Sequence, residues 1–162
     1  TIKLSRIRPH VVANQPHFTP KKSIFNRVVG DSRLELEFAA FLDECSDIIS
    51  FAKLTRNAHF HIEYINSEGT ISHYIPDFIV KENDKTYWIV ETKGLEDLGV
   101  RPKWERLVQW CKDANAANPN AAQYHPLFVP QLAFETKKPK SWSQALNHFK
   151  GLEPKKPRGS AR

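Results

Sequence analysis

Two acidic residues and a lysine in the middle of the chain have the types and spacing of a metal-dependent catalytic site. Asp77 follows Pro76, Glu91 lies fourteen residues after Asp77, and Lys93 lies two residues beyond Glu91. Side chains alternate across a β-strand, so Glu91 and Lys93 would share one face of an extended segment. If the segment that carries Asp77 pairs with this one, the two carboxylates can converge on one cation.

These residue types suit Mg²⁺, and we expect that Mn²⁺ can replace it. Mg²⁺ binds one or two carboxylates, keeps several waters and takes further oxygen ligands from substrate phosphate. A metal bound by Asp77 and Glu91 would polarise a phosphate and lower the pKa of a water molecule. The Lys93 ammonium would orient that water or stabilise developing negative charge. The pattern therefore predicts metal-assisted attack of water on a phosphate without a covalent intermediate.

A second copy of the same three letters occurs later in the chain. Glu135-Thr136-Lys137 repeats Glu91-Thr92-Lys93, but it is followed by Lys138-Pro139, and proline suits the edge or the end of a strand. The first copy has apolar residues before it, a glycine after it and a turn that leads to it from Asp77. We therefore predict that the first copy is the site. The alternative is that Asp77 and Glu91 are ordinary charges that face water.

A third carboxylate is expected from a helix that begins near residue 33, and two residues are candidates. Glu35 and Glu37 lie on opposite borders of the apolar stripe of this helix. Glu35 also occupies the last position of a capping box that starts at Ser32, so its alternative role is to cap its own helix.

The elements that must position these residues follow from periodicity and turn residues. Apolar residues recur at helical spacing from Leu34 to Ile49, which predicts an amphipathic helix. Three strand-like runs follow, with turn residues between them, and indicate a three-stranded meander. The predicted elements after the first helix are strands at 60–64, 71–80 and 86–93, a helix from about Pro102, a short strand at 127–129 and a helix at 142–149. This order predicts an α/β fold with a mixed sheet flanked by helices.

At these residues the sequence resembles the PD-(D/E)xK nuclease superfamily, and more narrowly the C-terminal endonuclease domain of type III restriction enzyme subunits. The resemblance covers roughly residues 20 to 150. The segments that carry it are Asp31-Ser32-Arg33-Leu34-Glu35-Leu36-Glu37-Phe38-Ala39, Tyr74-Ile75-Pro76-Asp77-Phe78, Val90-Glu91-Thr92-Lys93-Gly94 and Arg106-Leu107-Val108-Gln109-Trp110-Cys111.

The resemblance implies a restriction-endonuclease-like αβββαβ core that hydrolyses DNA. It implies a metal held by Asp77, Glu91 and the Thr92 carbonyl, with Lys93 at the attacking water and Glu35 assisting. Lys103 and Arg106 would hold DNA phosphates, although a solvated helix face is an equal alternative for them. It also implies double-stranded DNA as substrate and, as partners, an NTP-driven motor domain and a methylation subunit. No phosphate-binding loop of the motor type occurs in these residues.

Length and charge give the domain organisation. We predict a basic extended arm at 1–31, a nuclease domain at 32–150 and a basic disordered tail at 151–162. Residues 1–33 hold seven Lys or Arg against one acid, and residues 137–162 hold eight against one, so the stretch between them is net negative. Basic ends suit a polyanion, or they are merely solvated. The first residue is Thr and methionine is absent, so we expect an excised C-terminal piece of a longer chain.

Other sequence features set the compartment and the rival functions. The two cysteines lie in apolar helical patterns, and no apolar run is long enough for a membrane span, so a cytoplasmic protein is expected. Rival functions are a nucleic-acid-docking module with an idle acidic site, and a structure-selective repair nuclease or resolvase. His59, His61 and His73 suggest a zinc site only weakly, because no cysteine or close histidine pair completes a usual ligand set.

Overall fold

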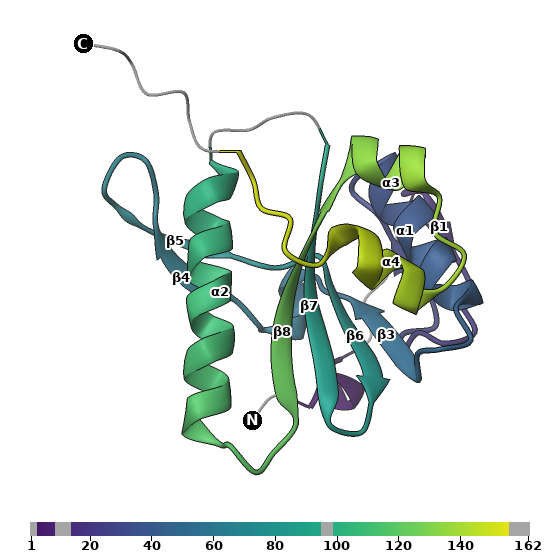
Figure 1. The fold of residues 1–162 in the computed structure, drawn as a ribbon, viewed down its shortest axis with the longest axis horizontal. Coiled ribbons are helices and arrows are strands. Elements are labelled where there is room, and N and C mark those ends of the chain that lie inside the picture. The colour runs from purple at the N-terminus through teal and green to yellow at the C-terminus, as the bar shows by residue number, and fades with distance from the viewer. Residues whose placement is uncertain (1–2, 9–13, 95–98, 156–162) are drawn as a thin grey trace.

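The chain folds as a four-stranded sheet with helices on both faces and two small satellite sheets (Figure 1). A computed structural model describes residues 3–8, 14–94 and 99–155. The α-helices are α1 (Arg33–Glu44), α2 (Val100–Ala117), α3 (Gln131–Lys137) and α4 (Trp142–Phe149), and two short 3-10 helices span Leu4–Arg6 and Arg56–Ala58. The strands are β1 (His17–Phe18), β2 (Val28–Val29), β3 (Ser50–Lys53), β4 (Ile62–Ile65), β5 (Ile71–Tyr74), β6 (Phe78–Asn83), β7 (Thr86–Lys93) and β8 (Gln123–Pro130).

Helix α1 begins where the capping signal predicts but ends earlier than expected. The Ser32 hydroxyl accepts a hydrogen bond from the Glu35 backbone N–H and so caps the first turn. The helix ends at Glu44, so the prediction that it reaches Ile49 is wrong. The turn that follows the helix is bound to α4 instead: the Asp47 carboxylate accepts hydrogen bonds from the backbone N–H groups of Trp142 and Ser143 at the start of α4.

The predicted three-stranded meander is also wrong in its pairing. The run from Ile71 to Val80 is two strands, separated at Ile75 to Asp77. Proline has no N–H for a sheet ladder, and Pro76 lies at this break. As a result β5 pairs with β4 in a separate hairpin, whereas β6 pairs with β3 and β7.

The main sheet has the order β3-β6-β7-β8. Its first three strands are antiparallel, and β8 runs parallel to β7 after the crossover through α2. The predicted mixed sheet flanked by helices is therefore confirmed. The αβββαβ order is present as α1, β3, β6, β7, α2 and β8, with β3 in place of the strand expected at 60–64.

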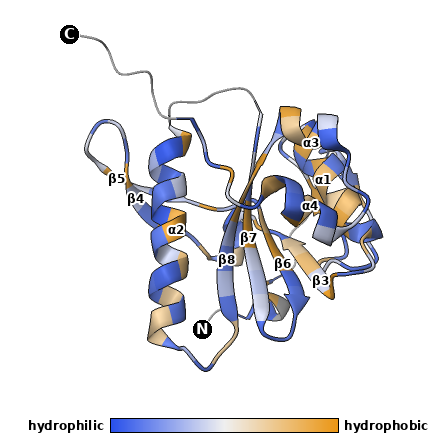
Figure 2. Cartoon of the chain, in the orientation of Figure 1, coloured by the Kyte–Doolittle hydropathy of each residue, from blue (hydrophilic) through white to orange (hydrophobic). Residues whose placement is uncertain are grey.

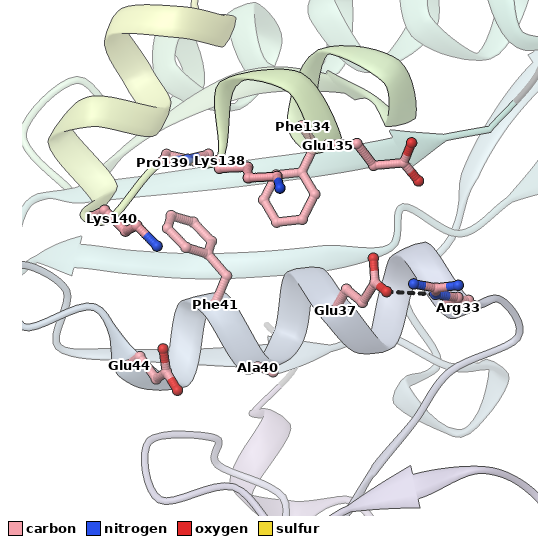
Figure 3. A pocket seen from close by; sticks show the side chains of 10 residues that line it. All are labelled: Arg33, Glu37, Ala40, Phe41, Glu44, Phe134, Glu135, Lys138, Pro139 and Lys140. Atoms are coloured by element: carbon pink, nitrogen blue, oxygen red, sulfur yellow. Dashed lines mark hydrogen bonds and ion pairs between the residues drawn. The ribbon is translucent and has the colours of Figure 1, made fainter.

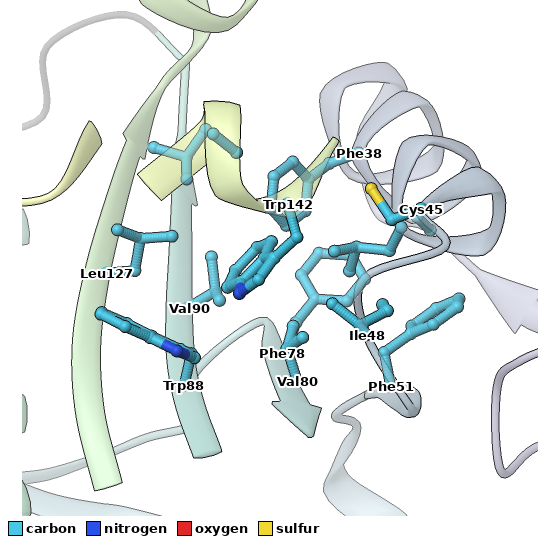
Figure 4. Close-up of a cluster of buried hydrophobic side chains, with 14 of the residues drawn as sticks. Phe38, Cys45, Ile48, Phe51, Phe78, Val80, Trp88, Val90, Leu127 and Trp142 are labelled. Carbon is cyan, nitrogen blue, oxygen red and sulfur yellow. The ribbon is translucent and has the colours of Figure 1, made fainter. Parts of the chain in front are cut away.

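Two apolar clusters hold the helices to the sheet. The larger one joins α1 and α4 to one face through Phe38, Phe78 and Trp142, as Figure 4 shows. The smaller one joins α2 and the β4–β5 hairpin to the other face through Ile62, Ile89 and other residues. Figure 2 shows apolar colour on the central strands, between the two helical layers. Cys45 and Cys111 are buried and free, as their apolar settings predict.

The N-terminal segment covers the outer edge of β3. The Ile24 N–H donates to the Phe51 carbonyl, and the Phe51 N–H donates to the Lys22 carbonyl. Val28 is 1% exposed and belongs to the larger cluster. The predicted arm at 1–31 includes residues 1–2 and 9–13, which lie outside the described residues. So does most of the predicted tail, from residue 156 on. Among the described helices, none has the length and apolar character needed to span a bilayer.

Phe38 tests the larger cluster. It is fully buried, and its ring contacts those of Phe41, Phe78 and Phe134. We expect Phe38→Ala to lower the free energy of unfolding by about 3 to 5 kcal/mol in urea denaturation, because it leaves a cavity. Ile65→Ala, at a side chain that is 64% exposed, is the control and should change stability by less than about 0.5 kcal/mol. Equal losses in both variants would contradict this packing.

Candidate active site

The predicted acidic site lies where β6 begins, β7 ends and α1 starts. The Asp77 N–H donates to the Val90 carbonyl, and the Asp77 carbonyl accepts from the Leu54 N–H. The backbone of Asp77 is thus held between β3 and β7. This places its side chain at the end of the three antiparallel strands, one position outside β6.

The Asp77 carboxylate is bound to the strand that carries the second acid. Its Oδ2 atom accepts hydrogen bonds from the backbone N–H and from the hydroxyl of Thr92, both at 2.7 Å. Burial raises the pKa of Asp77, and the charge of Glu35 adds to the rise, whereas Lys53 and the two bonds from Thr92 oppose it. The carboxylate is therefore desolvated but well ordered.

Lys53 is a part of this site that the sequence analysis missed. Its side chain is 7% exposed, and its Nζ atom lies 3.1 Å from Oε2 of Glu35 and 3.7 Å from Oδ1 of Asp77. The residue was missed because β3 was not recognised as a strand. A signal was present, because Phe51-Ala52-Lys53-Leu54 places one lysine inside a short apolar run, where an unpaired cation would be costly.

Of the two candidates for the third carboxylate, Glu35 faces the site and Glu37 does not. Glu35 contacts Lys53 through Oε2, and the same atom accepts a hydrogen bond from the Asp31 N–H. It therefore supports the chain before the helix and contributes charge to the site. Glu37 instead forms an ion pair with Arg33 on the neighbouring turn.

Glu91 is a buried acid whose surroundings disfavour its charged form. It is 9% exposed, its Oε2 atom has no hydrogen-bond partner within bonding geometry among the described residues, and the buried Tyr74 hydroxyl lies near enough to affect its titration. Burial raises the pKa of Glu91 well above its ordinary value, and the charge of Asp77 raises it further, while the Tyr74 hydroxyl, Lys103 and Lys93 oppose the rise. A carboxylate in this state is suited to accept a cation.

The three basic residues predicted for the site are placed differently. Lys93 ends β7, and it and Lys103 of α2 are near enough to affect the titration of Glu91. The Lys103 ammonium also lies 5.8 Å from the centre of the Tyr64 ring. Arg106 is engaged within the domain: its Nε donates to the Glu63 carbonyl, and its Nη1 lies 3.5 Å from Oδ2 of Asp113.

The second copy of the motif lies on a helix. Residues 135–137 end α3, and the exposed Glu135 carboxylate accepts a hydrogen bond from Gln131 one turn earlier. No strand presents Glu135 and Lys137 on a shared face. The geometric context that favoured the first copy is present at β7, where Glu91 and Lys93 are two residues apart on one strand.

A groove of about 630 Å³ lies apart from these acids, between α1 and the α3–α4 connection (Figure 3). Its lining mixes charged and aromatic side chains, including Glu37, Phe41, Phe134 and Lys140. It contains neither Asp77 nor Glu91, so the candidate site is the strand-end cluster and not this groove.

A family model described as an endonuclease domain matches residues 21–125 of the chain. The chain belongs to this endonuclease family. The matched range contains Glu35, Lys53, Asp77 and Glu91, and it excludes the second motif copy at 135–137. Comparisons with curated proteins and with solved structures give no significant match. As a member of this family, the chain is a nuclease. It is therefore a hydrolase whose substrate is nucleic acid.

The buried acids of the endonuclease domain make its stability depend on pH. Asp77 and Glu91 have pKa values above the ordinary 3.8 and 4.5, so the folded state binds their protons more tightly than the unfolded state. Their ionisation therefore costs stability at neutral pH, and this cost is removed as the pH falls through the folded pKa values toward 4.5. In EDTA we expect the stability contribution of these two groups to rise as the pH is lowered from 8 to 5.

Glu91→Gln isolates the larger part of this effect. We expect it to raise the free energy of unfolding at pH 7.5 by about 1 kcal/mol, and to weaken the dependence on pH, because it removes an unpaired buried charge. Urea denaturation between pH 5 and 8 measures both. Glu68→Gln, in an exposed turn, is the control. A Glu91→Gln protein less stable than the parent at pH 7.5 would contradict the assignment.

Lys53→Met should lower the free energy of unfolding of the endonuclease domain, in contrast to Glu91→Gln. It keeps the length of the side chain but leaves Glu35 and Asp77 without their shared cation. We expect a loss of about 3 kcal/mol at pH 7.5, as for other broken buried ion pairs. The loss should be smaller at pH 5, because burial raises the pKa of Asp77 and uptake of a proton relieves its repulsion with Glu35. Denaturation at both pH values measures it beside the exposed Lys112→Met. A loss that is equal at the two pH values would assign the effect to packing.

Proposed function

We propose that this domain is a Mg²⁺-dependent endonuclease that cuts DNA, with Asp77, Glu91 and the Thr92 carbonyl as the protein ligands of the metal. The observation that supports this most is the pair of buried carboxylates where β6 begins and β7 ends: the charge of Asp77 raises the pKa of Glu91, and Oε2 of Glu91 has no hydrogen-bond partner among the described residues. The charges of Lys103 and Lys93 and the Tyr74 hydroxyl offset this repulsion only in part, because the pKa of Glu91 stays well above its ordinary value.

The chemistry of these residues fits the proposed metal. Carboxylate and carbonyl oxygens are the hard ligands that Mg²⁺ prefers, and one or two carboxylates are the usual number. Glu35 is not needed as a ligand, because its charge is already shared with Lys53 at 3.1 Å. When bound, the metal would polarise the scissile phosphate and lower the pKa of the attacking water.

The chain's own residues would prepare the reaction around that centre. Thr92 orients the Asp77 carboxylate through two hydrogen bonds. Lys53 opposes the rise in the pKa of Asp77 and so helps to keep it ionised at neutral pH. Lys93 would hold the attacking water or stabilise the charge that develops on the phosphate, and Glu35 would assist through the cation that it shares with Asp77.

Basic residues beside the acids would position the nucleic acid. Lys103 lies near Glu91 on α2, so its ammonium can meet a phosphate next to the reacting one. Arg106 has contacts to the Glu63 carbonyl and to Asp113, and would have to share its guanidinium with a phosphate. We therefore propose Lys103 as the stronger phosphate contact of the two.

The proposed setting is a type III restriction system acting on double-stranded DNA. It rests on the segments around Glu35, Asp77, Glu91 and Arg106, which resemble those restriction subunits. An NTP-driven motor domain and a methylation subunit would then supply movement and target choice. One such site cuts one strand, so a double-strand break would need a second copy of the domain.

Nicking of supercoiled plasmid DNA tests the proposal. The domain is incubated with Mg²⁺, Mn²⁺ or EDTA beside Asp77→Ala and Lys93→Ala. We expect nicking that requires the metal and falls at least about 100-fold in both variants, because each removes a group that stabilises the transition state. Glu135→Gln and Lys137→Ala alter the second motif copy and are the matched controls, so their rates should equal that of the parent.

The other outcomes of this assay have distinct meanings. Nicking that survives Asp77→Ala would overturn the proposed site. Salt-sensitive DNA binding that ignores Mg²⁺, without nicking, would support a docking module with an idle site. Faster cutting of flaps or four-way junctions than of plain duplex would support a structure-selective repair nuclease or resolvase.

A further inference from the structure

A second cluster of metal-binding side chains lies on the β4–β5 hairpin, outside the acidic site. His61 precedes β4, Glu63 lies within it and His73 lies within β5, and all three side chains are exposed. The alternate residues Ile62 and Tyr74 are buried against α2 in the smaller apolar cluster. The hairpin therefore has an apolar inner face and an outer face that carries two imidazoles and one carboxylate.

The register of the hairpin brings these three groups together. Glu63 pairs directly with His73 across the two strands, and His61 is two residues from Glu63 on the same side of its strand. The His61 and His73 ring centroids are 4.5 Å apart. One potential ligand atom from each of the three residues lies within 4.8 Å of the others, and no other trio of acidic, histidine or cysteine side chains in the described ranges does so.

We propose that His61, Glu63 and His73 form a binding site for a borderline transition-metal ion such as Zn²⁺, Co²⁺ or Ni²⁺. Two imidazole nitrogens and one carboxylate oxygen match the ligand preference of these ions, whereas Mg²⁺ prefers an all-oxygen set. Three protein ligands leave at least one position for water or another group. The two clusters would thus select different metals, hard ions at Asp77 and Glu91 and borderline ions at the hairpin.

The frame behind the site is held in place by α2. The Arg106 Nε donates to the Glu63 carbonyl, and the same guanidinium contacts Asp113. This fixes the β4 backbone while leaving the Glu63 carboxylate on the outer face. A two-stranded hairpin alone is only marginally stable, and β4 and β5 are not hydrogen-bonded to the main sheet. A metal bound by both strands would therefore stabilise their pairing.

The test measures metal binding directly, in a background where the acidic site is disabled. The parent for this experiment carries Asp77→Asn and Glu91→Gln, and Zn²⁺ is titrated in by calorimetry with Mg²⁺ present in excess. We expect one equivalent to bind despite the Mg²⁺. His73→Ala and Glu63→Gln should each weaken binding at least about ten-fold, because each removes one of three ligands. His59→Ala alters an exposed neighbour outside the trio and should bind like the parent.

Two spectroscopic readouts locate the ion. Co²⁺ in place of Zn²⁺ should give absorption bands that disappear in His73→Ala, and amide NMR shifts on addition of Zn²⁺ should centre on β4 and β5. Circular dichroism checks that the variants remain folded, which their exposed positions favour. Absence of Zn²⁺ binding in the double-variant parent, equal binding in His73→Ala, or shifts centred on β6 and β7 would each overturn the proposal.

Discussion

The cost of removing two carboxylates from water at one end of the sheet is the constraint on which the rest of the site depends. Burial raises the pKa of both Asp77 and Glu91; the charge of Glu35 adds to the rise at Asp77, and the charge of Asp77 adds to the rise at Glu91. Asp77 is supported by Thr92 and Lys53, and Lys53 in turn needs Glu35 as a second counter-ion. The start of α1, the edge strand β3 and the end of β7 are thus linked through charge, and the folded state retains an unfavourable interaction at the position where catalysis would use it.

The parts of the fold that could be predicted are those that local chemistry decides. The capping residue Ser32 predicts where α1 begins, and the spacing of apolar residues predicts the first and last residues of α4. The prediction failed where the same apolar letters fit two structures. Ile48 continues the helical spacing of α1, yet it lies in the turn before β3, where Asp47 caps α4 from nearly a hundred residues away. Such a long-range partner leaves no trace in local periodicity.

In the candidate site too, local sequence predicts some residues, whereas others depend on contacts between distant segments. Alternation along one strand was enough to place Glu91 and Lys93 together, and the setting of the second copy was enough to prefer the first. The choice between Glu35 and Glu37 depended on Lys53, because both acids border the same apolar stripe and only one meets the lysine. Lys53 itself comes from a strand whose partners, β6 and the N-terminal segment, lie on either side of it in space and far from it in sequence.

The N-terminal segment that hydrogen-bonds to β3 also restricts how two copies of this domain can associate. An open strand edge is a template on which another chain can add a strand, and this leads to dimers or to aggregates. Both main-chain groups of Phe51, within the four-residue edge strand, are already bonded to Lys22 and Ile24. At Phe51, the addition of a strand from another chain to the edge of β3 is therefore blocked by the chain itself. If two copies of the domain act together, they would therefore have to associate through the helices, the hairpin or the far side of the sheet.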